Sequence, residues 1–432
     1  MAKMYDLCIF GPDEPALWLA AAAAADRFLR VALLLDPLPD ASLPCFPHLP
    51  IDPARLTAVA ENFGFRPAPS PFPPYLPELQ VIVAGRPLDL IADPTFYHSS
   101  LERDLQERAA PFLARADELE QMADTAIAAA REQNFPGEPP VPANPPIWRK
   151  WSKPKRWQPA ISPPWSQWSA DLPAGERAAL AACATAWLGF PLPVEAETLL
   201  VALGWRLTRS LHHGGGDDTD LRTLAAERVA KRGAVIEAGP ETVTAKGVDG
   251  HSLKLRGGTV IQARALMGPA AALARLFGER RELPGPLALR RTFFLKLDRD
   301  TIPDCLAPRA LAVTDPAKPT MGENLLLLAR APRAPRRESL AVTLFHPPAH
   351  LKVEDLPRLL AEALPWLNPK LVTPDETHEP ASALVHPPRA LQREAEPSSL
   401  PFANLFPLPS ELLPSWGLWG TMLGARQETI KP

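Results

Sequence analysis

The turn after the first apolar run holds the residues with the clearest chemical meaning. The segment IFGPDEP places Gly11, Pro12 and Asp13 directly after the strand-like residues 5–10, and Ala16 begins an alanine-rich helix. A turn with glycines at its first, third and sixth positions lets the backbone approach a pyrophosphate and offers N–H donors at a helix N-terminus. Only Gly11 meets this pattern, because Asp13 and Ala16 occupy the other two glycine positions.

The charge of Asp13 opposes a bound pyrophosphate. Two like charges ~4 Å apart repel by ~4 kcal/mol at an effective dielectric constant near 20. Glu14 adds a second carboxylate, and Pro12 and Pro15 remove two N–H donors from the turn. Ala16 still lets the helix pack closely on a strand. The turn therefore indicates a dinucleotide scaffold with a degraded phosphate loop.

Asp36 ends a second apolar strand, residues 31–35. This is the position from which a carboxylate binds a ribose in a dinucleotide fold. An Asp-Pro turn after a buried strand explains the same residue without a ligand. Both interpretations stay open.

The remaining apolar patterns predict the elements that must position these residues. Period-2 and period-3.6 patterns separate strands from helices. They predict a hairpin at 80–91 with Gly85 in its turn, and a long amphipathic helix at 99–133 that Pro111 kinks or divides. Helices follow within 172–211, where Pro191 and Pro193 interrupt them. The rest of the chain is predicted to hold a helix, a strand and a three-stranded meander within 214–268, further strands within 287–346, and a helix at 353–364.

In this order the chain resembles the FAD-dependent oxidoreductases of the phytoene desaturase and flavin amine oxidase type. Three blocks carry the resemblance: residues 5–36, 214–277 and 405–427. The resemblance implies that the first block holds the ADP half of FAD through Gly11, Pro12, Asp13, Ala16 and Asp36. It places Val235 where a strand backbone would touch adenine, although Val235 fits a plain core position equally well.

The third block is similar to the flavin-end motif of that family. Its P-x-x-G-L-x-G pattern consists of Pro414, Gly417, Leu418 and Gly420, with Glu411 in the preceding turn. The resemblance implies that a helix N-terminus here lies against the flavin, where its partial positive charge suits a reduced, anionic ring. The family's Gly-Asp pair before this helix and its arginine- and glycine-rich stretch after the second strand have no counterpart.

The resemblance implies an α/β fold with two domains. We expect a discontinuous Rossmann-like FAD/NAD(P)-binding domain from residues 1–75, 205–285 and 396–432. Residues 76–204 and 286–395 would form a mixed α+β substrate or cap domain, which includes a Pro- and Trp-rich basic segment at 135–169.

Two functions follow from a degraded loop on this scaffold. One is a non-catalytic relative, a pseudoenzyme or interaction component. The other is an active FAD-dependent oxidoreductase that acts on an apolar small molecule, with Asp13 turned away from the phosphates. FAD is the cofactor that the resemblance implies, and the loop opposes its binding. No catalytic base or nucleophile emerges from the sequence, so enzymatic activity stays undecided.

The amino-acid composition limits which binding partners and which cellular compartment we expect. The 46 basic and 49 acidic side chains give a formal net charge of -3, which offers no general reason to bind nucleic acid. Cys8, Cys45, Cys183 and Cys305 show no metal-site spacing, and we expect no metal. His212 and His213 are best explained by a polar turn, and His346 and His350 have no further ligands near them. We expect a cytoplasmic protein without a transmembrane segment.

The 135–169 segment is the candidate interaction surface. Trp148, Trp151 and Trp157 alternate with lysines and arginines, and such residues can dock an acidic partner, lie at a membrane interface or stack on bases. Packing of the tryptophans against a part of the chain that lacks regular structure is the alternative. Packing is the favoured interpretation. A protein partner at Trp148, Trp151, Trp157 and the neighbouring basic residues is the second, and peripheral membrane contact stays open.

Overall fold

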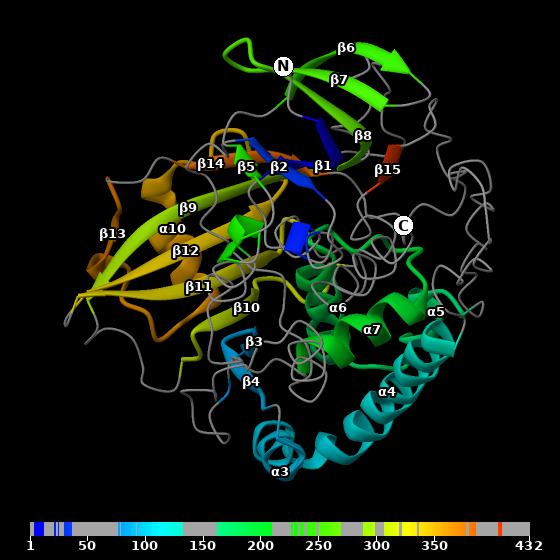
Figure 1. Ribbon diagram of the computed structural model, residues 1–432. Coiled ribbons are helices and arrows are strands. Elements are labelled where there is room, and N and C mark those ends of the chain that lie inside the picture. Colours follow the sequence, from blue (N-terminus) through cyan, green and yellow to red (C-terminus); the bar gives the residue numbers. More distant parts are fainter. Residues whose placement is uncertain are drawn as a thin grey trace.

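The computed structural model describes two sheets and the helices that pack on them (Figure 1). The described residues are 4–12, 21–22, 25, 30–36, 77, 79–91, 93–132, 162–209, 226–227, 229–231, 234–236, 240–247, 250–268, 288–298, 306–318, 322–334, 337–376, 380–385 and 405–407. All structural statements below concern these residues.

The first sheet contains the N-terminal strand and has the order β5-β2-β1-β8-β7-β6, with β15 paired to β8. Strands β5, β2, β1, β8 and β15 are parallel, whereas β7 and β6 complete an antiparallel meander. The bounds are β1 (Met4–Pro12), β2 (Val31–Asp36), β5 (Ala234–Ile236), β6 (Pro240–Gly247), β7 (Gly250–Leu255), β8 (Val260–Gly268) and β15 (Leu405–Pro407).

Both faces of β1 and β2 are buried, which explains the nearly continuous apolar residues of these two strands. Leu7 and Ile9 of β1 contribute to one core, and Cys8 and Phe10 contribute to another on the opposite face. The alanines at 21, 22 and 25 belong to the first of these cores and are fully buried. Small side chains at these positions let their helix approach the strands closely.

The second sheet has the order β13-β9-β12-β11-β10-β3-β4, and β14 pairs with β9. Its strands are antiparallel neighbours except for the parallel pair β3 and β10. The bounds are β3 (Leu79–Val83), β4 (Arg86–Leu90), β9 (Ala288–Asp298), β10 (Arg309–Val313), β11 (Leu325–Ala334), β12 (Arg337–Phe345), β13 (Val372–Pro374) and β14 (Ala381–Val385).

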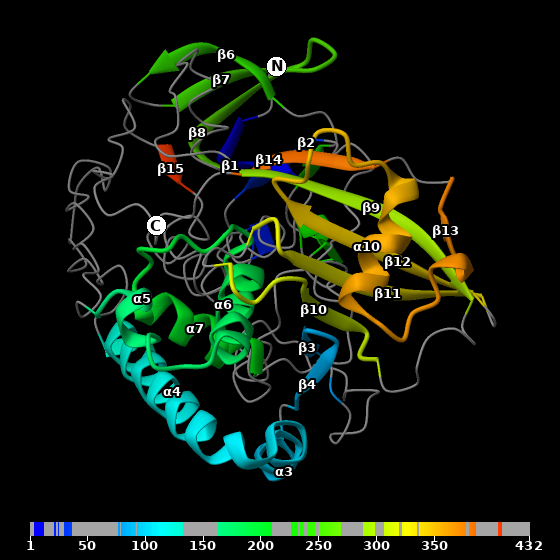
Figure 2. The same ribbon diagram turned by 180° about the vertical axis from the view of Figure 1, so that it is seen from behind.

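Helices cover the second sheet on both faces. Helix α10 (Leu356–Ala363), which follows the short helix η4 (Val353–Asp355), buries its apolar side in the core that contains Phe293 and Leu295. Figure 2 shows α10 lying over β9, β12 and β11. Helix α6 (Ala174–Leu188) packs against β3 and β10 in the other core. That core also contains Leu7 and Ile9, so it joins the two sheets.

The remaining helices pack around α7 and the β3–β4 hairpin, except for η5 (Pro369–Leu371), which lies beside α10. The others are α3 (Pro94–Leu105), η1 (Gln106–Arg108), α4 (Ala109–Glu132), α5 (Trp165–Trp168) and α7 (Thr198–Arg209). Helix α7 packs between α6 and α4, and α4 lies at the periphery of the molecule (Figure 1).

The expected long helix is divided, but not at Pro111. The chain breaks at Gln106, which has a φ of 54°, and a new helix starts at Ala109. Pro111 therefore lies in the first turn of α4, where a missing N–H leaves no hydrogen bond unmade. The predicted hairpin at 80–91, the meander, the helices around Pro191 and Pro193 and the strands within 287–346 are confirmed.

Candidate functional site

The parallel strands of the first sheet end at one edge. Their last residues are Ile236 in β5, Asp36 in β2, Pro12 in β1, Gly268 in β8 and Pro407 in β15. In open α/β sheets, ligands bind in the crevice beyond the carboxyl ends of the strands. This edge is therefore the candidate ligand site.

The strand register brings three of the predicted site residues together. Gly11 is the Cα partner of Leu35, and Pro12 is the partner of Asp36. Val235 is paired with Leu33 one strand further out, in the middle of a three-residue strand. The other predicted site residues lie outside the described residues, namely Asp13, Ala16, Glu411, Gly417, Leu418 and Gly420.

The chemistry at the end of β1 does not fit the pyrophosphate of a dinucleotide. The strand continues in register through Pro12, so the chain does not turn at Gly11. Pro12 has no N–H to donate, and none of the five strand-end residues is basic. The buried alanines at 21, 22 and 25 keep the close packing of helix on sheet that the fold requires. The close packing of the scaffold is thus retained, whereas Pro12 offers an anion no N–H donor at the end of β1.

A second set of polar residues lies on β9 and β12 of the second sheet. The hydroxyls of Thr292 and Thr343 are 2.9 Å apart, and both residues are buried. Lys296 on the same face of β9 forms an ion pair of 3.1 Å with the fully buried Asp375 side chain. Arg290 precedes Thr292 by two residues and shares this face.

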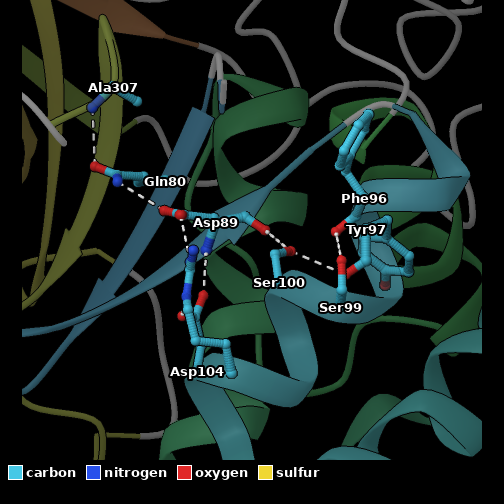
Figure 3. Close-up of polar contacts among 9 residues, drawn as sticks. Gln80, Asp89, Phe96, Tyr97, Ser99, Ser100, Asp104 and Ala307 are labelled. Carbon is cyan, nitrogen blue, oxygen red and sulfur yellow. Dashed lines mark hydrogen bonds and ion pairs between the residues drawn. The ribbon is translucent and has the colours of Figure 1, made fainter. Parts of the chain in front are cut away.

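A polar junction joins the hairpin β3–β4 to α3 (Figure 3). Arg103 donates to Asp89 Oδ2 at 2.6 Å and to Asp104 Oδ1 at 2.7 Å. Gln80 Nε2 donates to Asp89 Oδ1 at 2.7 Å, and Gln80 Oε1 accepts from the Ala307 N–H at 2.9 Å. The carboxylates of Asp89 and Asp104 are thus held by fixed donors. The junction thus anchors α3 on the sheet.

The described cysteines are poor nucleophiles. Cys8 and Cys183 are buried free thiols. Burial raises the pKa of Cys183 to about 12 and raises the pKa of Cys8 even further. Both therefore stay protonated near neutral pH, and nucleophilic catalysis needs the thiolate.

Histidine and acidic residues do not form a metal site in the described part of the chain. No group of three or more His, Cys, Asp or Glu side chains there could hold an ion. His346 and His350 are exposed, whereas His212 and His213 lie outside the described residues.

The described end of the Trp-rich segment packs on the protein itself. Trp165 is buried and stacks on Trp168 with 5.6 Å between ring centroids. The Arg115 guanidinium of α4 lies over the Trp168 ring at 5.1 Å. Trp148, Trp151 and Trp157 lie outside the described residues. None of the described helices is long and apolar enough to cross a membrane.

Sequence reasoning did not single out Arg290, Thr292 and Thr343. Their signal was present in the segment ALRRTFFLKLD, where a period of two places Arg290 and Thr292 on one face of a strand. The pattern could not show which face meets the core that joins the sheets.

The fold matches those of solved amine oxidases over nearly the whole chain. A putrescine oxidase variant gives a TM-score of 0.58 at 12% identity, covering 99% of this chain and 98% of that chain. Putrescine oxidase with bound putrescine gives 0.56 at 13% identity, and cyclohexylamine oxidase from Brevibacterium oxydans gives 0.55 at 13%, each with the same coverage. No protein-family model and no curated protein sequence matches this chain. The predicted α/β FAD-binding fold is confirmed.

Proposed function

We propose that this chain, which has the α/β FAD-binding fold of the amine oxidases, is a relative that has lost FAD-dependent redox chemistry and serves as a binding or interaction component. The observation that carries the proposal is the pairing of Pro12 with Asp36 at the end of the β1–β2 ladder. A strand that runs through Pro12 leaves no glycine turn to receive a pyrophosphate.

The residues that follow β1 strengthen this argument. Asp13 and Glu14 come next in the chain and add negative charge close to the strand ends, where two phosphate charges would lie. Pro12 and Pro15 supply no N–H donors. Both the electrostatic and the hydrogen-bonding contributions to pyrophosphate binding are therefore reduced.

An active FAD-dependent oxidoreductase with an apolar substrate is the second candidate. It is favoured by β15, which pairs in parallel with β8 and ends at Pro407. The segment containing Pro414, Gly417 and Gly420 follows this strand, as the resemblance to the flavin-end motif requires. In this case the flavin would supply the redox chemistry, and Asp13 would have to point away from the phosphates.

The interaction role predicts a contact surface in the Trp-rich segment. We propose Trp148, Trp151 and Trp157 as the contact residues for an acidic protein partner, since lysines and arginines stand between them. Changing all three to Ala removes that partner from affinity-purified protein if the proposal holds. An unchanged partner set, with the fold intact by circular dichroism, would eliminate the segment as the contact.

A titration with FAD tests the loss of cofactor binding. The wild-type chain, Asp13→Gly and the double variant Pro12→Ala/Asp13→Gly are each added to FAD while flavin fluorescence is followed. We expect no binding by the wild type, measurable binding by Asp13→Gly, and tighter binding by the double variant. Removing the charge is worth up to roughly a thousandfold in affinity.

Asp117→Asn is the matched control, because Asp117 is exposed on α4 and its loss changes the net charge equally. Stoichiometric binding of FAD by the wild type would reject the proposal. Unchanged affinity of both loop variants would show that residues other than Pro12 and Asp13 block the cofactor.

A further inference from the structure

Strands β7 and β8 bury one face and expose the other. Leu253, Leu255 and Ile261 lie in the core that also contains Cys8 and Phe10 of β1. Successive side chains of a strand point to opposite faces of the sheet. The alternate residues of the two strands are accordingly exposed, namely Lys254, Val260, Gln262 and Arg264. The meander therefore presents a solvent-exposed face at one end of the molecule (Figure 1).

The strand register continues this outer face onto the start of β1. Val260 pairs with Lys254 across β7 and β8, and Gln262 pairs with Met4 across β8 and β1. Met4 and Val260, at 43% and 42% exposure, are two of the five large apolar side chains that are exposed in the described part of the chain. The register thus places two exposed apolar side chains on neighbouring strands of one face.

Positive charge predominates on the same face. Asp6 is its acidic residue, and it forms ion pairs of 3.3 Å with both Arg264 and Arg30. Lys254 and, in the turn between β7 and β8, Arg256 add two more cations. The outer strand β6 contains one acidic and one basic residue, whose charges cancel. We refer to this surface as the basic face, which comprises Arg30, Lys254, Arg256, Arg264, Met4 and Val260.

The opposite end of the molecule carries an excess of negative charge. Helices α3, η1 and α4 contain eight Asp and Glu residues but four Arg residues. Both views place these helices away from β6, β7 and β8 (Figures 1 and 2). An extended anionic surface therefore attracts the basic face and repels the end that holds α3 and α4. This charge separation orients the molecule, although the formal net charge of the chain is -3.

A bilayer with anionic headgroups fits these features. Basic residues are attracted to such a surface within a Debye length, and cations that share one face can approach it together. Apolar side chains such as Met4 and Val260 gain by entering the boundary between the headgroups and the acyl chains. Binding of single-stranded nucleic acid relies on aromatic side chains on which bases stack, and the basic face contains none.

We propose that the basic face docks on a bilayer surface that is rich in anionic phospholipid. Its four cations lie over the headgroups, and its two apolar side chains, Met4 and Val260, enter between them. The contact uses neither FAD nor the carboxyl ends of the parallel strands. It therefore goes beyond the proposed function and does not depend on it.

Cosedimentation of the 432-residue chain with lipid vesicles tests this surface. One vesicle preparation consists of phosphatidylcholine alone, and the other contains about one third phosphatidylserine. We expect binding to the phosphatidylserine vesicles only. This binding should be lost in about 1 M NaCl, where the Debye length falls to about 3 Å.

Lys254→Gln/Arg264→Gln removes two cations of the basic face. Each basic residue near an anionic bilayer raises the affinity about fivefold, so this double variant should bind phosphatidylserine vesicles about 25-fold more weakly. Met4→Gln/Val260→Thr keeps the charges and a β-branched residue in β8, and it should weaken binding about 2- to 5-fold. Circular dichroism verifies the fold of each variant.

Arg358→Gln/Lys370→Gln is the matched control. Both side chains are exposed, on α10 and η5 of the other sheet, and their loss changes the net charge equally. The control should bind phosphatidylserine vesicles as the wild type does. Equal losses in the control and in Lys254→Gln/Arg264→Gln would overturn the proposal, since net charge and not the basic face would then govern binding.

Three further outcomes would overturn the proposal. The first is equal binding to both vesicle preparations, or binding to neither. The second is an unchanged affinity of Lys254→Gln/Arg264→Gln, which would assign the contact to another part of the chain, such as the Trp-rich segment. The third is displacement of the protein from the vesicles by an equal concentration of poly-glutamate, which would assign the basic face to an acidic protein.

Discussion

Pro12 and Asp36 are partners in the last rung of the parallel ladder between β1 and β2. Both strands therefore end at the same level, and Asp13 is the first residue beyond β1. A pyrophosphate loop needs its turn and its free N–H groups at this level. The structure places Pro12 at this level, and Asp13 follows it in the sequence.

The close contact between α6 and α7 at Gly204 gives the first prediction. A Cβ built on Gly204 of α7 would lie 2.5 Å from the Ala184 Cα of α6, a contact with backbone that a rotamer change cannot relieve. Gly204→Ala should therefore lower the free energy of unfolding by about 1–3 kcal/mol, measured by urea denaturation.

Gly175→Ala is the control for that substitution. A Cβ there meets only Val83 Cγ1 at 3.5 Å, which is an ordinary contact. Gly175 lies in the first turn of α6, where alanine is the better helix former. The free energy of unfolding of Gly175→Ala should therefore equal that of the wild type or exceed it by up to about 1 kcal/mol. Equal stabilities of the two variants would show that α6 and α7 are further apart than described.

The buried ion pair between β11 and β12 gives the second prediction. Arg330 Nε and Nη2 donate to the two Glu338 oxygens at 2.8 and 3.1 Å, and Arg330 also donates to the Leu306 carbonyl. Glu338→Ala leaves the Arg330 charge buried without a carboxylate and should cost about 3–5 kcal/mol of unfolding free energy.

The double variant Arg330→Met/Glu338→Leu should recover most of this loss, because it removes both charges and keeps the volume. Urea denaturation of both variants measures the difference. A double variant as unstable as Glu338→Ala would show that packing around the pair, and not the unpaired charge, determines the cost.

The carboxyl group of Glu176 should make the folding stability of the protein depend on pH. Burial in the first turn of α6 raises the pKa of its carboxyl, and the Arg108 guanidinium 3.4 Å away offsets only part of this effect. The folded state thus binds the proton more tightly than the unfolded state. Stability from this group rises as the pH falls through the folded-state pKa, and the gain is complete below the unfolded-state value of 4.5.

Glu176→Gln should accordingly raise the melting temperature at pH 7, with the difference from the wild type vanishing near about pH 4. Calorimetric scans from acid to neutral pH measure this, and Glu323→Gln, an exposed position, is the control. A melting temperature of Glu176→Gln that falls below the wild type at pH 7 would show that the ion pair with Arg108 outweighs the burial of the charge.

Much of the fold could be predicted from local patterns. The strand of residues 5–10, the strand from Val31 and the hairpin around Gly85 follow from apolar runs and turn residues, and the structure has each of them. The position of the helix break did not follow, because proline is tolerated in a first turn and Gln106 carries no breaking signal.

The candidate site could be predicted only in part, because register and burial are tertiary properties. The sequence indicated Gly11, Pro12 and Asp36 separately, and only strand pairing shows that Pro12 and Asp36 are neighbours. Arg290 and Arg291 look equivalent in the sequence. They differ because α10 and Leu351 lie on one face of β9, and those contacts come from residues about 60 positions further along the chain.

The visible absorbance spectrum of the purified wild-type protein, recorded before and after incubation with excess FAD and removal of free flavin, tests the central claim most directly. The account predicts a colourless protein in both cases. Flavin bands at near-stoichiometric occupancy in either spectrum would contradict it.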